Sequence, residues 1–173
     1  MPRSTVSLLA LLVSAACGPL GRSGGGAADG TLAVAWTGST AGRFSAPAEA
    51  RWCAADTLLE VIAARHDTAV GFTLLPRPAV DTGTYPVSPV EVASPARPQS
   101  GLALRWLAEN DLMQFEGSAG RIRVTARDQN QLSGTVSGEL RRQLARDSVR
   151  LTGRFTRIPV KPAADGCGRA VKP

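Results

Sequence analysis

Short runs in which apolar and polar residues alternate recur along the chain from residue 31 onward. Successive side chains of a β-strand point to opposite faces, so this period of two predicts strands that bury one face. Gly, Pro, Asn and Asp separate the runs, as turn residues do. The runs are TLAVAW, LLEVIAAR, AVGFTLLP, PVEVAS, GLALRWLA, RIRVTAR, LSGTVSGEL and SVRLTGRF. Eight such runs without a helical pattern predict an all-β domain, either an antiparallel β-sandwich or a small β-barrel of about eight strands.

The last three runs have the clearest alternation. Residues 121–127 and 149–156 alternate apolar side chains with arginine and threonine. Between these runs, Gly134 and Gly138 share the inner face, where they leave space for a large ring or mark bends. The intervening segment 139–148 fits either one helical turn or a wide hairpin loop. We predict an antiparallel meander whose outer face carries five arginines: Arg121, Arg123, Arg127, Arg150 and Arg154.

An apolar stretch of eleven residues, Val6–Ala16, precedes the domain. A helix that spans a bilayer needs about 20 residues, so this stretch is too short to span alone. It follows Arg3 and ends in small residues, which is the layout of a secretory signal. A buried core helix is the other interpretation of such a run. We predict that residues 1–16 are a signal peptide.

The small residues Ser14, Ala15 and Ala16 directly before Cys17 and Gly18 resemble the lipobox of bacterial lipoproteins. This resemblance implies that Cys17 becomes the lipid-modified N-terminus, with acyl chains such as palmitate that anchor the protein to a membrane outside the cytoplasm. Gly18, rather than aspartate, after the cysteine resembles the pattern that directs lipoproteins to the outer membrane. Plain secretory cleavage after Ala16 is the alternative.

The mature chain divides into two parts. Residues 17–30 hold the cysteine and a glycine-rich segment, which we interpret as a flexible tether of about 20 Å root-mean-square reach. Residues 31–173 are long enough for one domain with a hydrophobic core.

The cysteine count agrees with lipidation. Of the three cysteines, Cys53 and Cys167 remain if Cys17 carries lipid. An exported protein meets an oxidising environment, so we predict that these two form a disulfide, which the chain-entropy model values at about 5 kcal/mol. Two buried thiols are the alternative. Neither cysteine has a CxxC neighbour and the one histidine is His66, so we expect no metal site and no cofactor.

The stretch VDTGT, residues 80–84, resembles the Asp-Thr-Gly loop of aspartic proteases. The resemblance implies that the carboxylate of Asp81 would share a proton with a second carboxylate around a water molecule. The chain holds one such copy, so a peptidase would be a homodimer. An ordinary turn is the other interpretation, since Asp, Thr and Gly are all turn residues.

Two further groups of residues allow a chemical interpretation. His66 and Asp67 could belong to a Ser/His/Asp triad, but no GxSxG motif is present and a hairpin turn explains the pair. Trp36, Trp52 and Trp106 could form a platform for sugars, although core packing accounts better for their positions in the alternating runs.

The net charge of +6 is unevenly distributed. Residues 17–120 carry seven arginines and ten acidic residues, whereas residues 121–157 carry nine arginines and three acidic residues. An exported protein does not meet nucleic acid, so an anionic envelope surface, such as lipid headgroups or phosphorylated glycans, is the expected partner. The leading hypothesis is therefore a lipid-anchored module with a non-catalytic binding or structural role in the cell envelope. The alternative is a dimeric aspartic peptidase that uses Asp81.

Overall fold

The computed structural model describes residues 28–77, 79–89, 98–109, 111–128, 130–142 and 145–163. Within these residues the chain forms nine β-strands and no helix. The strands are β1 (Thr31–Gly38), β2 (Gly42–Cys53), β3 (Leu58–Arg65), β4 (Thr68–Leu75), β5 (Gly83–Pro86), β6 (Gln99–Ala108), β7 (Asp111–Asp128), β8 (Gln131–Arg142) and β9 (Ser148–Pro162).

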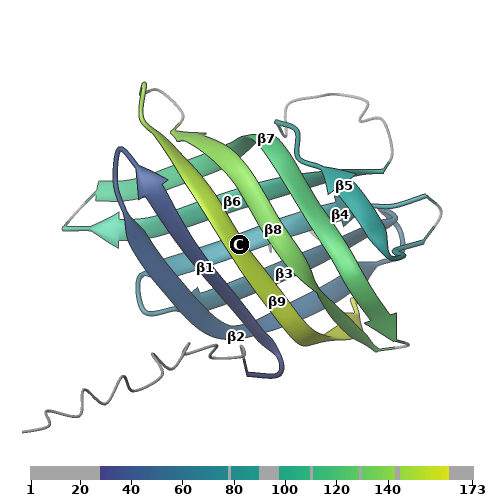
Figure 1. Ribbon diagram of the computed structural model, residues 1–173. Coiled ribbons are helices and arrows are strands. Elements are labelled where there is room, and N and C mark those ends of the chain that lie inside the picture. The colour runs from purple at the N-terminus through teal and green to yellow at the C-terminus, as the bar shows by residue number, and fades with distance from the viewer. Residues whose placement is uncertain are drawn as a thin grey trace, which may run out of the picture.

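Eight of the strands close into an antiparallel β-barrel, and β5 is an additional strand (Figure 1). Around the barrel consecutive strands pair with one another, except that β4 pairs with β6 rather than with β5, and β1 pairs with β9 to join the two ends. The long strand β7 pairs with β6 over its first residues and with β8 over most of its length. In the view of Figure 1, β1, β9, β8 and the second part of β7 cross in front of β3, β4 and β6. The all-β prediction is confirmed, and of the two predicted architectures the barrel is the one formed.

The inward side chains of these strands fill the barrel as one hydrophobic core. The rings of Phe72 and Phe155 meet with centroids 5.1 Å apart, from strands on opposite walls. Nearer the hairpins that end β1 and β6, Trp106 stacks between Trp36 and Phe115, at 5.7 Å and 5.3 Å. Trp36 is 8% exposed, so the interpretation of this tryptophan as a core residue is confirmed.

The inward glycines of β8 accommodate large neighbours. A Cβ at Gly134 would lie 2.5 Å from Cζ of Phe155, and one at Gly138 would lie 2.9 Å from Cδ2 of Leu102. Both distances are too short for real carbon atoms, so each glycine provides room that a side chain needs. The expectation that these glycines leave space for a large ring is confirmed at Gly134.

Strand β5 and the residues after it close the gap that opens between β6 and β7. β5 pairs with the second half of β7, and Val87 forms a parallel bridge to Ser100 of β6. The Ser100 hydroxyl, buried at 1% exposure, donates to the carbonyls of Tyr85 and Pro86, each at 3.0 Å. A buried hydroxyl needs such partners. Ser100 therefore attaches this segment to the barrel wall.

The structure also changes the predicted element list. The sequence pattern did not identify β2, the short strand β5 or the first part of β7. Proline is unfavourable inside a strand, and β2 contains Pro47; the inward positions of β2 are mostly alanine, which lacks a strand preference. Of the two interpretations of residues 139–148, the hairpin is the one formed, since β8 continues to Arg142 and β9 begins at Ser148. Most of the predicted run PVEVAS lies outside the described residues.

Candidate functional site: the arginine face

Four of the five predicted arginines lie together on the outside of the barrel. Strands β7, β8 and β9 pair in order, as predicted. Thr135 of β8 pairs with Arg123 on one side and with Arg154 on the other. One row along, Ser137 separates Arg121 from Thr152 in the same way. The two arginine-bearing strands are therefore about 10 Å apart, two strand spacings, with hydroxyl side chains between them.

A fifth arginine joins this surface from a strand that the sequence pattern missed. Ala35 of β1 pairs with Arg43 of β2 and with Thr152 of β9, so Arg43 extends the row that contains Arg121. The alternation of Arg43, Phe44 and Ser45 is the signal that could have identified it. We call the outer surface formed by these exposed side chains the arginine face: Arg43, Arg121, Arg123, Arg150 and Arg154.

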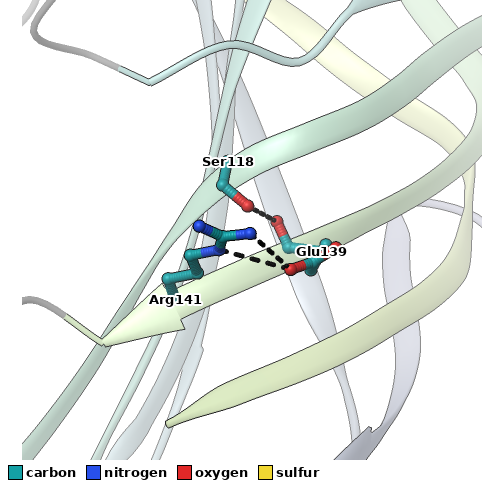
Figure 2. A network of polar contacts seen from close by, with 3 residues as sticks. All are labelled: Ser118, Glu139 and Arg141. Carbon is teal, nitrogen blue, oxygen red and sulfur yellow. Dashed lines mark hydrogen bonds and ion pairs between the residues drawn. The ribbon is translucent and has the colours of Figure 1, made fainter. Parts of the chain in front are cut away.

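The charges of the arginine face have no ion-pair partner among the described residues. Glu139 pairs in register with Arg150, but its carboxylate accepts hydrogen bonds from Nη2 and Nε of Arg141, at 3.1 Å and 3.3 Å. Ser118 donates to the main-chain carbonyl of Glu139 at 3.1 Å (Figure 2). The ion-pair partner of Glu139 is therefore Arg141 and not Arg150. Repulsion between arginines 10 Å apart in water is only about 0.4 kcal/mol, so the face is stable without a bound anion.

Arg127 does not share the face predicted for it. A β-bulge between Val124 and Ala126 shifts the register, so Arg127 pairs with the inward residue Leu132. Its guanidinium instead donates to the carbonyl of Val80 at the end of the barrel. The same bulge places Ala126 outward, where it is exposed. The prediction that Arg127 lies beside Arg121 and Arg123 is therefore wrong, because one extra residue exchanges the two faces of a strand.

The Asp-Thr-Gly stretch forms the turn that leads into β5. The Tyr85 hydroxyl accepts a hydrogen bond from the amide of Asp81 and donates to its carbonyl, both at 3.0 Å. The carboxylate of Asp81 is exposed and accepts from the amide of Thr82 at 2.7 Å. These bonds account for the segment as a turn. A peptidase would need a second copy to supply the other carboxylate, and that alternative stays a prediction.

His66 and Asp67 form the two-residue turn between β3 and β4, as the hairpin interpretation predicted. The positive φ of His66, 51°, is the conformation that such tight turns require. The carbonyl of Asp67 accepts a hydrogen bond from the amide of Leu107 at 3.1 Å. The pair thus has a structural role at the end of the barrel.

The predicted lipidation and disulfide sites are only partly described. Cys17, Cys167 and the whole of residues 1–27 lie outside the described residues. Cys53 ends β2 and is completely buried. The carbonyl of its neighbour Trp52 accepts a hydrogen bond from the amide of Ala163 at 2.9 Å. The chain therefore passes beside Cys53 only four residues before Cys167, and their disulfide stays a prediction.

Among the described residues, no three His, Cys, Asp or Glu side chains gather in a way that could hold a metal ion. The same part of the chain contains no helix of the length and hydrophobicity needed to cross a membrane. Comparison of the chain with protein-family models, with curated proteins and with solved structures finds no match.

Proposed function

We propose that this protein is a lipid-anchored barrel of the bacterial cell envelope, with a non-catalytic binding or structural role outside the cytoplasm. In this proposal Cys17 carries the lipid, the glycine-rich segment is the tether, and the arginine face holds the barrel against the anionic phospholipid headgroups of the anchoring membrane. The signal-like N-terminus supports the compartment, and the outer membrane is favoured by Gly18. The position of Ala163 next to Cys53 supports a disulfide to Cys167, as expected in an oxidising compartment.

The observation that carries the proposal is the arginine face itself. Five exposed arginines from three strands, β2, β7 and β9, lie on the outer surface, and the carboxylate of Glu139, which pairs in register with Arg150, already has Arg141 as its partner. Each cation near an anionic membrane contributes about 1 kcal/mol. A lipid on Cys17 would keep the barrel within about 20 Å of the headgroups, so weak individual contacts would act together.

The first expected result concerns the anchor. Mass spectrometry of membrane-extracted protein should find acyl groups on Cys17, because the cysteine of a lipobox is the modified residue. Replacement of Cys17 by serine should move the protein from the membrane fraction to the soluble fraction. An unmodified N-terminus at Gly18 or Cys17 would exclude the lipid anchor.

The second expected result concerns the arginine face. The chain from Gly18 onward, produced without lipid, should sediment with phosphatidylglycerol vesicles at low salt and be released at high salt, because ions screen the attraction. Changing Arg121, Arg123, Arg150 and Arg154 to serine should remove about 4 kcal/mol of binding, on the order of a thousandfold.

A matched control variant loses four positive charges as well, but from positions outside the arginine face. Arg65, Arg77, Arg146 and Lys161 are exposed and lie outside the arginine face. If net charge alone causes binding, their replacement by serine will weaken sedimentation as strongly as the first set, and the proposal fails. Binding that ignores both salt and the arginine face would also contradict it. Phosphatidylcholine vesicles should bind neither protein.

A further inference from the structure

A hollow of about 300 Å³ lies over β3, β4, β6 and the first part of β7. Strand β7 contributes Gln114 and Glu116 to its wall but not the intervening Phe115, whose side chain is buried in the core. The hollow therefore opens on the outside of the barrel, over β3, β4 and β6, which contribute nothing to the arginine face, and over the part of β7 that precedes Arg121. Its lining includes four outward positions with little or no side chain: Ala69, Gly71, Gly101 and Ala103.

Two leucines are exposed next to this hollow, on the hairpin of β6 and β7. Leu107 is 49% exposed and Leu112 is 52% exposed, and they are the large hydrophobic side chains that stand out to solvent among the described residues. They are register partners, two residues beyond Arg105 and Gln114 on the same outer side of the sheet. A single exposed leucine is ordinary, but a pair beside an apolar hollow is typical of an interface.

The wall of the hollow carries side chains of opposite charge. Arg105 makes no ion pair with another described residue, and Glu116 accepts a hydrogen bond only from the neutral Gln114, at 3.1 Å, among those residues. The other carboxylate of the wall, Glu60, is already paired with Arg51 at 3.0 Å. One cation and one anion thus remain available on the same surface, which is what a contact between identical copies requires.

We propose that two copies of this chain associate through this surface, with a two-fold axis along the seam between β6 and β7. Such an axis exchanges residues that are register partners in these strands. Leu107 of each copy then lies over Leu112 of the other. Arg105 of each copy lies over Gln114 of the other, within reach of the neighbouring Glu116 of that other copy. Every contact occurs twice, so two apolar contacts and two ion pairs form together.

The strands that flank the seam, β4 beside β6 and β8 beside β7, explain what the hollow would accommodate in the dimer. Gly71 of β4 pairs with Ala103 on one side of the seam, and Arg141 of β8 pairs with Glu116 on the other. The same axis therefore places Arg141 of one copy over Gly71 of the other, so a long side chain meets a residue that has none. Arg141 is 67% exposed in its ion pair with Glu139, and an exposed pair of this kind is weak enough to rearrange.

The experiment measures the mass of the intact chain in nonionic detergent by analytical ultracentrifugation over a range of concentrations. The wild type should dimerise, whereas Leu112→Lys, Arg105→Glu and Glu116→Arg should each weaken dimerisation by about tenfold or more. Leu112→Lys places a charge against the apolar Leu107 of the other copy, and each of the other two changes places like charges opposite one another. An equimolar mixture of Arg105→Glu and Glu116→Arg should recover the dimer, because both ion pairs then join opposite charges. Ser45→Lys, an exposed change on β2, should leave dimerisation unchanged.

The altered side chains are exposed or partly exposed, and circular dichroism checks that each variant folds. Oxidation of a mixture of differently tagged Leu107→Cys and Leu112→Cys chains should give cross-linked pairs, which is a second readout of the same contact. A wild type that stays monomeric overturns the proposal. So does a dimer that survives the three substitutions, or a mixture that does not recover it.

Discussion

The Phe155→Ala variant should lose about 3–5 kcal/mol of unfolding free energy. Phe155 is 1% exposed, packs on Phe72 and lies over Gly134. Its removal leaves a cavity between opposite walls. Because the hydrogen-bonded strands close on themselves, the walls cannot move inward easily to fill that cavity. A domain of this size has only about 5–15 kcal/mol of stability, so the loss is a large share of the total.

Urea unfolding followed by tryptophan fluorescence measures this effect. The control is Ser45→Ala, at an exposed position outside the surface proposed for dimerisation, which should change the unfolding free energy by about 0.5 kcal/mol or less. If Phe155→Ala unfolded at the wild-type urea concentration, the closed and packed interior described above would be incorrect.

The Gly134→Ala variant should lose about 1–3 kcal/mol, although it adds a single methyl group. That methyl would overlap the main-chain carbonyl oxygen of Arg123 and approach Cζ of Phe155 to 2.5 Å. The Phe155 ring has some freedom to shift, but the carbonyl belongs to the pairing between β7 and β8. Relief of the overlap therefore has to disturb the sheet.

Gly71→Ala is the control for this second prediction. A Cβ at Gly71 faces the outer hollow and would lie 3.2 Å from the carbonyl oxygen of Val61, so that oxygen has to move by only a few tenths of an ångström. The loss of unfolding free energy should therefore be clearly smaller than that of Gly134→Ala. In the double variant Gly134→Ala/Phe155→Ala, the overlap with the Arg123 carbonyl persists, so the two losses should nearly add. A full rescue by Phe155→Ala would show that the ring alone causes the strain.

The local alternation of side chains was sufficient to predict most strands. It identified the turn at His66 and Asp67, the meander of β7 to β9, and the space at Gly134. These features depend on neighbouring residues, since a strand buries every second side chain and a tight turn needs particular backbone angles. For the same reason the pattern was weak in β2, which contains Pro47 and several alanines, and β2 was missed together with Arg43.

Closure and register were decided by tertiary structure. A sandwich and a barrel have the same alternation along each strand, so only the pairing of β7 with both β6 and β8 distinguishes them. The bulge at Val124 and Ala126 depends on the partner strand, and it moved Arg127 away from the face that its spacing predicted.

The sequence by itself determined most of the strands and the outward positions of Arg121, Arg123, Arg150 and Arg154. It also predicts the cellular location of the protein, which depends on residues 1–18. Only the tertiary structure decided which arginines form one surface, because Arg43 reaches it through the pairing of β1 with β2 and β9. It also placed Leu107, Arg105 and the hollow side by side. Alternation specifies the face to which each side chain points, whereas pairing specifies its neighbours, and a surface that binds requires both.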